Sequence, residues 1–91
     1  MKQYHVFIFG FVQGVGFRFF VKSNAKRLEL YGWVRNTEDN RVEAVFQGND
    51  EKIKEIIELC KKGPFLAEVK DLVVEREEIK EKFEDFEIRN L

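Results

Sequence analysis

The sequence predicts an α+β fold, in which two helices cover one face of an antiparallel sheet. The chain has 91 residues, of which 44% are hydrophobic and 36% charged, a composition typical of a single folded domain spanning residues 1–91. Two segments carry apolar residues at the spacing of amphipathic helices. The β-rich segments around them give the order βαββαβ, with a short strand added at the end. That order is typical of a ferredoxin-like α/β sandwich.

The first half of the chain contains a strand, a glycine-bearing loop and a helix. Residues 4–12 are rich in aromatic and β-branched side chains, which predicts an inner strand buried on both faces. Residues 13–16 interrupt this run. From Phe17 the spacing becomes helical, with apolar residues on one side and cations such as Lys22 and Lys26 on the other.

A hairpin is expected next. Residues 31–36 and 41–47 are β-rich, and residues 37–40 between them supply the turn. Asp39 or Asn40 in that turn tolerates a positive φ angle better than most residues. We therefore predict two antiparallel strands joined by a short loop.

The second half begins with a helix whose two ends are marked in the sequence. Residues 48–51 offer an N-cap and an acidic first turn, and residues 61–64 bring cations, glycine and proline that end the helix. Residues 68–76 read as a strand with a bulge, because their apolar residues do not alternate strictly. Residues 86–88 form a short last strand.

Charge and composition argue against several classes of protein. Sixteen basic and seventeen acidic residues give a net charge of −1, without the basic excess of a general nucleic-acid binder. No apolar run approaches the roughly 18 residues of a membrane span, and the N-terminus lacks the apolar core of a signal peptide. One cysteine and one histidine cannot form an internal disulfide or a zinc site. We expect a cytoplasmic monomer without metal or cofactor, and the wealth of Lys, Glu and Arg favours a heat-adapted source.

Residues 10–18 are the most informative segment, because they place glycines and an arginine between a strand and a helix. Such a loop can direct successive backbone N–H groups into one concavity, where the helix N-terminus adds partial positive charge. The planar guanidinium of Arg18 can fold over this concavity and matches phosphate oxygens better than an ammonium group. The segment therefore predicts a binding site for a tetrahedral oxyanion.

Three known phosphate-binding loops do not fit these residues. A Walker A loop requires a lysine after its last glycine, and none follows here. A dinucleotide fingerprint requires a third glycine at the position of Phe19. A Cys-x5-Arg phosphatase loop would place its nucleophile at Val12, which has no nucleophilic atom.

The lack of a nucleophile in the loop points to an activated substrate. Covalent catalysis requires a Ser, Thr, Cys, Asp or His, so water is the expected attacking group. An acyl phosphate suits such a site because its leaving group is a carboxylate, whose conjugate acid has a pKa of about 4. Asn36, at the end of the next predicted strand, offers an amide that can hold the water in line.

Two segments of the chain closely resemble the signatures of the acylphosphatase family. They are residues 10–18 and residues 32–39 with Val42 and Glu43, and the similarity extends over nearly the whole chain. The resemblance implies metal-free hydrolysis of an acyl phosphate to a carboxylate and inorganic phosphate. It also implies that Asn36 orients the water and that Arg18 and loop amides bind the phosphoryl group. The residues expected to provide this phosphate-binding loop are Gln13, Gly14, Val15, Gly16, Phe17 and Arg18.

The sequence departs from the family pattern at Asn40, where glycine is usual, and Gly16 occupies a variable position. Two alternatives remain open. One is a non-catalytic or carbamoyl-phosphate-handling module, as in the N-terminal domain of hydrogenase-maturation proteins. The other is an RNA-binding domain, because residues 16–21 superficially echo an RNA-recognition motif. His5 and Cys60 are expected to be structural, the role of the Gln13 side chain is open, and broad acyl specificity is expected.

Overall fold

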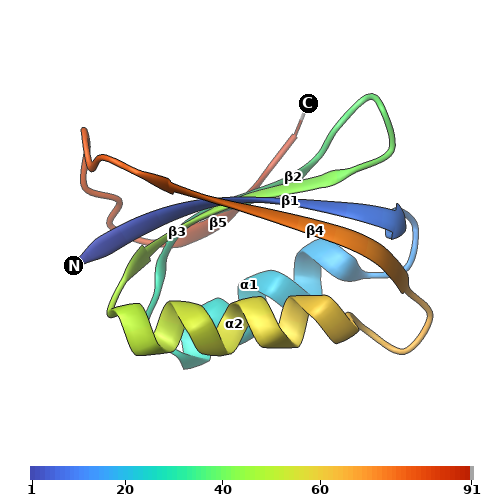
Figure 1. The fold of residues 1–91 in the computed structure, drawn as a ribbon, viewed down its shortest axis with the longest axis horizontal. Helices are drawn as coiled ribbons and strands as arrows, with labels where there is room; N and C mark the ends of the chain where they lie inside the picture. The colour runs from blue at the N-terminus through green and yellow to red at the C-terminus, as the bar shows by residue number, and fades with distance from the viewer. Residues whose placement is uncertain (91) are drawn as a thin grey trace.

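A computed structural model describes residues 1–90 of the chain, and its elements follow the predicted order. Both helices lie beneath the same face of the sheet, and the other face is open (Figure 1). None of the helices in the described residues is long and apolar enough to cross a membrane. The elements are β1 (Lys2–Phe11), α1 (Phe17–Arg27), β2 (Tyr31–Asn36), β3 (Val42–Gly48), α2 (Asp50–Lys62), β4 (Glu68–Glu77) and β5 (Phe86–Arg89).

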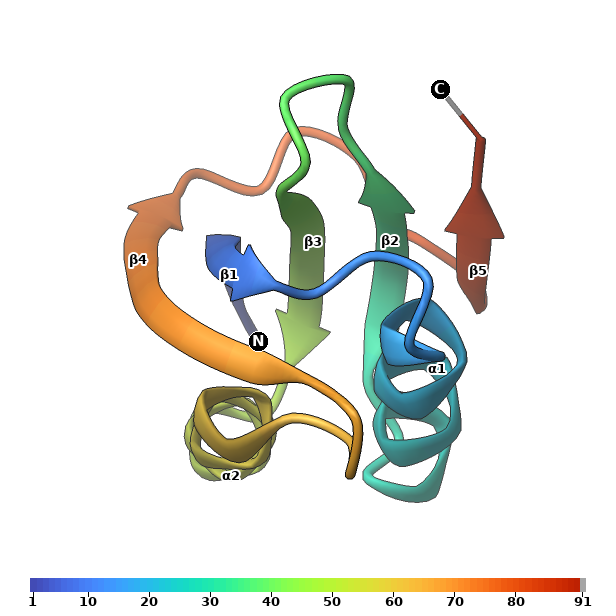
Figure 2. The same cartoon turned by 90° about the vertical axis from the view of Figure 1, so that its right-hand side faces the viewer.

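The five strands form one sheet in the order β4-β1-β3-β2-β5. The ferredoxin-like sandwich is confirmed, but the expectation of a wholly antiparallel sheet is wrong at one edge, where β5 runs parallel to β2. The chain leaves β4 at one edge of the sheet and reaches the other edge before entering β5 (Figure 2). This long connection allows the parallel orientation that a tight hairpin would forbid.

The predicted irregularity in the strand of residues 68–76 is also confirmed. Phe9 pairs with Asp71, whereas Gly10 pairs with Val69, so Lys70 is the extra residue of a bulge. Gly10 has a φ angle of 134°, and a Cβ atom there would lie 2.2 Å from the carbonyl oxygen of Glu68. Only glycine fits this close approach between the two strands.

The first strand is not buried on both faces, contrary to the prediction. Val6 and Ile8 are fully buried on the helix side. His5 and Phe7 point to the open face and are half-buried. The reason is that side chains alone cover this face: the guanidinium of Arg41 lies 5.0 Å from the ring centre of Phe7, and the His5 ring stacks on Phe7 at 4.6 Å.

The core lies between the sheet and the two helices. Helix α1 buries Phe17, Val21 and Ala25, and α2 buries a matching stripe that includes Cys60. The rings of Phe46 and Phe86 stack at 5.6 Å, which anchors the short strand β5 to the rest of the core. This packing fixes the positions of β1 and α1, the two elements that the loop before α1 connects.

Side-chain caps and residues with positive φ angles lie at the ends of the helices and in the hairpin turn. The side chain of Asn49 accepts a hydrogen bond of 2.9 Å from the N–H of Glu51 and caps α2. Beyond α1, Glu29 has a φ angle of 58°, and the N–H of Leu30 donates to the carbonyl of Ala25 at 2.8 Å. In the β2–β3 turn, Asn40 has a φ angle of 68°, and it is one of the two residues named above as tolerating a positive φ angle.

Candidate active site

The loop between β1 and α1 has a left-handed backbone at two glycines. Gly14 has a φ angle of 74° and Gly16 one of 79°, conformations that other residues adopt at a cost. Gly16 is also the N-cap of α1 and provides no side-chain cap. The first backbone hydrogen bond at this helix start is donated by Phe20 to the carbonyl of Gly16. The N–H groups of residues 17–19 have no acceptor within the helix and are available to an anion.

Arg18 lies in the first turn of α1 and lines a pocket at the helix start. The pocket has a volume of about 220 Å³. Among the described residues, no carboxylate forms an ion pair with the Arg18 guanidinium, and Arg18 as a whole is half-buried. An arginine held at a helix N-terminus without a carboxylate partner is suited to bind an oxyanion. The pocket is lined by Val12, Gly14, Gly16, Phe17, Arg18, Phe19, Asn36 and Ile88.

Asn36 is the last residue of β2 and lines the same pocket. Its side-chain carbonyl oxygen, Oδ1, is buried and has no hydrogen-bond partner among residues 1–90. A buried acceptor without a partner is unusual in a folded protein, because its lost hydration costs free energy. An acceptor left open at a pocket wall is available to a water molecule or a ligand.

The side chain of Gln13 is turned toward the hairpin. Its Nε2 atom donates hydrogen bonds of 2.8 Å to the carbonyl oxygens of Thr37 and Arg41. These two bonds tie the loop before α1 to both ends of the β2–β3 turn. The amide nitrogen of Gln13 therefore has two structural partners in the hairpin.

The structure brings Arg18, Asn36, Gly14, Gly16 and Phe17 to one pocket. Gln13 braces the loop next to that pocket, and the side chain of Val15 packs against the core. Three lining residues were not among the predicted site residues: Val12, which lies in the segment of residues 10–18, Phe19 and Ile88. Phe19 carried a signal, since it is an aromatic residue on the polar side of an amphipathic helix. Ile88 carried none, because its strand is short and lies far along the chain.

The side chains that line the pocket include no Ser, Thr, Cys, His, Asp or Glu. The site therefore offers positive charge, amide donors and an amide acceptor, but no nucleophile for a covalent step. No cluster of three or more His, Cys, Asp and Glu side chains within residues 1–90 has the geometry of a metal site. Such a pocket can bind and polarise a phosphoryl group and position a water molecule beside it.

The one histidine lies outside this pocket, on the open face of the sheet. Its Nε2 atom is 2.6 Å from the Glu43 carboxylate and its Nδ1 atom 2.7 Å from the Glu77 carboxylate. Burial would lower the pKa of His5, but the hydrogen bonds to Glu77 and Glu43 outweigh it and raise the pKa above its usual value of 6.5. Cys60 is buried in α2, and burial raises the pKa of its thiol to about 12. Both side chains serve the fold.

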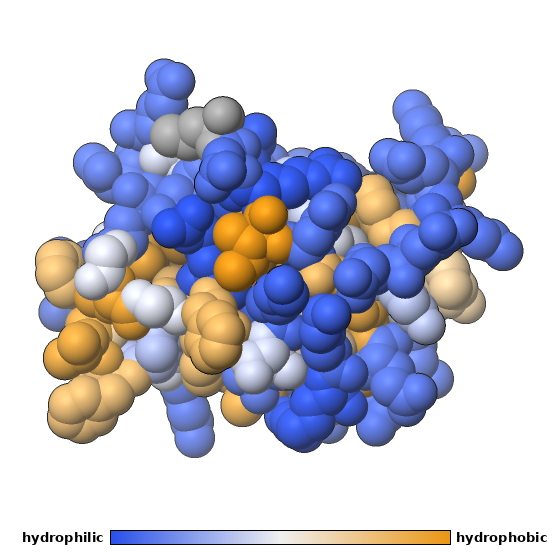
Figure 3. Space-filling view, turned by 180° about the vertical axis from the view of Figure 1, so that it is seen from behind, coloured by the Kyte–Doolittle hydropathy of each residue, from blue (hydrophilic) through white to orange (hydrophobic). Residues whose placement is uncertain are grey.

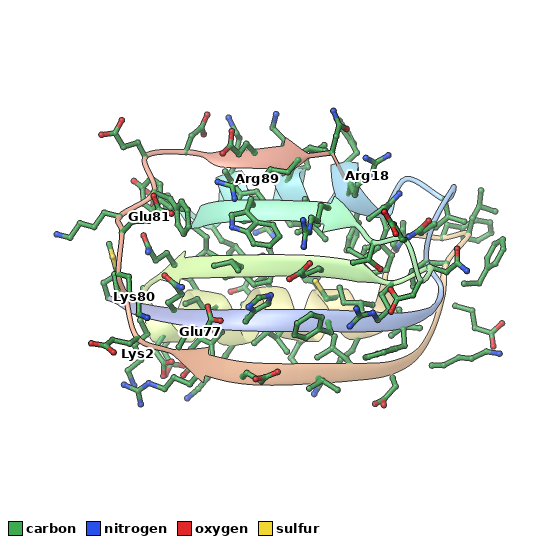
Figure 4. All side chains as sticks on the ribbon, turned by 90° about the horizontal axis from the view of Figure 1, so that it is seen from above. Lys2, Arg18, Glu77, Lys80, Glu81 and Arg89 are labelled. Atoms are coloured by element: carbon green, nitrogen blue, oxygen red, sulfur yellow. The ribbon has the colours of Figure 1, made fainter. Side chains whose placement is uncertain are left out.

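Other hollows on the molecule lie away from this pocket. Figure 4 looks onto the open face of the sheet, with Arg18 near one end and Lys2, Lys80 and Glu81 at the opposite end. A hollow of about 420 Å³ at that opposite end is larger than the pocket around Arg18. Volume does not identify the functional site. Of these two hollows, only the smaller is lined by a helix N-terminus together with an arginine and a buried acceptor that have no partner among residues 1–90.

A family model, curated relatives and solved structures were compared with the chain, and the matches given below belong to one family. The acylphosphatase family model matches residues 4–88. The chain is 49% identical over 74 residues to an acylphosphatase of Moorella thermoacetica, covering 81% of this chain and 80% of that protein. It is 48% identical over 87 residues to an acylphosphatase of Trichormus variabilis, covering 96% and 85%. The crystal structure of an acylphosphatase from Bacillus subtilis superimposes with a TM-score of 0.95 at 37% identity, over 98% of this chain and 99% of that one.

Proposed function

The chain belongs to the acylphosphatase family and hydrolyses the carboxyl–phosphate bond of acyl phosphates, and we propose that it does so by direct water attack on a phosphoryl group held by Arg18. The substrate is a small-molecule acyl phosphate, and the products are a carboxylate and inorganic phosphate. Neither a phosphate-handling module without turnover nor an RNA-binding domain is favoured, because this chain and the acylphosphatases compared above each cover most of the other's length.

In this proposal the phosphoryl group enters the loop before α1. The backbone amides of residues 13–18 and the guanidinium of Arg18 bind its oxygens and stabilise the charge that develops on them. The left-handed conformations of Gly14 and Gly16 support the proposal, because they let the loop bend around a tetrahedral group. Among residues 1–90 no carboxylate forms an ion pair with Arg18, which supports it too, since none of these groups has to be displaced from the guanidinium.

Asn36 holds the attacking water in the proposed mechanism. Its Oδ1 atom accepts a hydrogen bond from the water and directs the water oxygen toward phosphorus. The new P–O bond forms as the bond to the acyl oxygen breaks, and the carboxylate leaves with the electron pair. One proton of the water passes to a phosphoryl oxygen, and the other stays on the attacking oxygen, so that the product is dihydrogen phosphate. The observation that carries this step is the buried, unpartnered Oδ1 on the wall shared with Arg18.

We also propose that one chain in the cytoplasm suffices, without metal, membrane or nucleic acid. The support is that every group used above comes from a single protomer, from the loop, α1 and β2. A cofactor would have no step to perform, because the carboxylate is already a good leaving group.

Hydrolysis of benzoyl phosphate in ¹⁸O-labelled water tests the proposed route. Direct attack on phosphorus in a single step places one labelled oxygen in inorganic phosphate and none in benzoate. Label in benzoate would show attack at the carbonyl carbon, and the proposed role of the pocket would then be wrong. Formation of a phosphorylated protein during turnover would equally contradict direct attack.

A further inference from the structure

The pocket around Arg18 has an apolar side as well as a polar one. Phe19 and Ile88 line it together with Arg18 and Asn36. The Phe19 side chain is 71% exposed and Ile88 37% exposed, although both are large and hydrophobic. Single exposed apolar residues are common in proteins, but two that meet at one polar pocket are not explained by folding.

These two side chains come from rigid elements that flank the phosphate-binding loop. Phe19 follows Arg18 in the first turn of α1, on the side away from the buried Phe17. Ile88 lies on β5 opposite Val34 of β2, the strand that ends at Asn36. Seen from the side where α1 and β5 lie, hydrophobic side chains appear among a mostly hydrophilic surface (Figure 3).

The volume of the pocket exceeds what a phosphoryl group needs. A water molecule occupies about 30 Å³ in the liquid, so a pocket of about 220 Å³ holds roughly seven groups of that size. At the same volume per heavy atom, phosphorus and its three oxygens would fill roughly half of that space. The rest, beside Phe19 and Ile88, is available to the acyl side of the scissile bond.

We infer that Phe19 and Ile88 form an acyl-binding surface, which makes the enzyme prefer acyl phosphates with an aromatic or branched apolar acyl group. The inference rests on the proposed function, since it needs the phosphoryl group at Arg18. With that group anchored, the acyl group extends from the pocket along the two apolar side chains. It contradicts the expectation of broad acyl specificity, which considered the loop alone.

The expected effect is a change in relative specificity. Contact with Phe19 is made both before and during bond cleavage, so its loss raises KM more than it lowers kcat. One aromatic contact is worth up to about a tenfold change in affinity. Acetyl phosphate has only a methyl group beyond the carbonyl and loses little when the ring is removed.

The experiment compares kcat/KM for benzoyl phosphate and acetyl phosphate in the wild type, Phe19→Ala and Ile88→Ala. The matched control is Phe65→Ala, because Phe65 is 99% exposed and does not line the pocket. We expect Phe19→Ala to lower the ratio of benzoyl to acetyl kcat/KM about tenfold and Ile88→Ala about threefold. Phe65→Ala should leave the ratio unchanged. Phe19→Trp, which keeps an aromatic ring at this position, should retain the preference for benzoyl phosphate.

Inhibition by inorganic phosphate provides a second readout, since phosphate has no acyl group and its inhibition constant should be the same in all variants. An unchanged benzoyl-to-acetyl ratio in Phe19→Ala and Ile88→Ala would overturn the acyl-binding surface and leave the proposed function intact. Failure of the folded wild type to hydrolyse either substrate would instead contradict the proposed function itself.

Discussion

The side-chain amide of Gln13 donates a hydrogen bond of 2.8 Å to the carbonyl oxygen of Thr37, the residue that follows Asn36. A second bond of 2.8 Å from the same nitrogen reaches the carbonyl oxygen of Arg41. The loop proposed to bind the phosphoryl group and the strand end that carries Asn36 are thereby held at a fixed separation. Catalysis by positioning depends on that separation.

Replacing Gln13 with alanine should therefore lower activity without removing any group that contacts substrate. Because small misplacements of reacting groups are costly, we expect kcat/KM to fall about tenfold or more. The free energy of unfolding should fall by about 1–2 kcal/mol through two lost hydrogen bonds. Steady-state kinetics and denaturant unfolding measure the two effects.

Gln3→Ala is the matched control for Gln13→Ala. Gln3 donates to Glu77 at 2.9 Å and accepts from Gln47 at 2.7 Å, away from the pocket. Gln3→Ala should lose similar stability and keep full activity. Equal loss of activity in the two variants would show that Gln13 acts only through global stability.

Asn36→Ala should separate turnover from phosphate binding. Without the amide to orient water, kcat should fall by about 10²-fold or more. The inhibition constant of inorganic phosphate should stay within about twofold, because the loop and Arg18 still bind it. Stability should not decrease, since the variant removes a buried acceptor that has no partner. A large loss of phosphate affinity would reassign Asn36 to ligand binding.

The cluster on the open face of the sheet predicts a pH dependence of stability. The folded-state pKa of His5 is raised above 6.5, so its contribution is complete below about pH 6.5 and is lost as pH rises through the folded pKa. Burial would raise the pKa of Glu43, but the hydrogen bonds from Arg35 and His5 lower it below 4.5. Burial would likewise raise the pKa of Glu77, but the hydrogen bonds with Gln3 and His5 lower it. The carboxylates therefore stabilise the fold above about pH 4.5, and their contribution is lost in acid.

The free energy of unfolding should consequently fall as the pH rises from 6 to 9, because the charge-assisted bonds of His5 weaken. In His5→Gln this slope should be absent, because glutamine does not titrate. Urea unfolding at several pH values measures it. An equal slope in the wild type and His5→Gln would show that other groups cause the dependence.

Glu29→Gly should stabilise the fold at no cost to activity. Glu29 closes α1 with a φ angle of 58°, a conformation that costs a residue with a Cβ atom about 1 kcal/mol relative to glycine. The side chain is exposed. Thermal unfolding should shift upward by several degrees. A downward shift would mean that the greater freedom of glycine in the unfolded chain outweighs the relief of strain.

The parts of the fold that the sequence predicts well are those set by local chemistry. The apolar spacing from Phe17 and the Asn49 cap define the helices, and the left-handed Asn40 defines the hairpin. The parallel orientation of β5 escaped prediction, because alternation in four residues carries no strand direction. Arg18 and Asn36 were candidates from chemistry alone, whereas the bonds of Gln13 were not, since their acceptors lie 24 and 28 residues away.

The open face of β1 escaped prediction for a related reason. An apolar run such as residues 4–12 does not show whether helices or only side chains cover a face. Phe19 and Ile88 meet at the pocket only because β5 returns to the edge of the sheet beside β2. Contacts of this kind depend on topology rather than on neighbouring residues in the chain.

The role of Arg18 is the central claim, and hydrolysis of benzoyl phosphate by the wild type, Arg18→Ala and Arg18→Lys tests it most directly. With chelator present throughout, the wild type should turn over, and Arg18→Ala should be slower by about 10³-fold or more. Arg18→Lys should be nearly as slow, because a point charge does not reproduce the planar pair of donors. Turnover within about tenfold of the wild type in either folded variant would contradict the account.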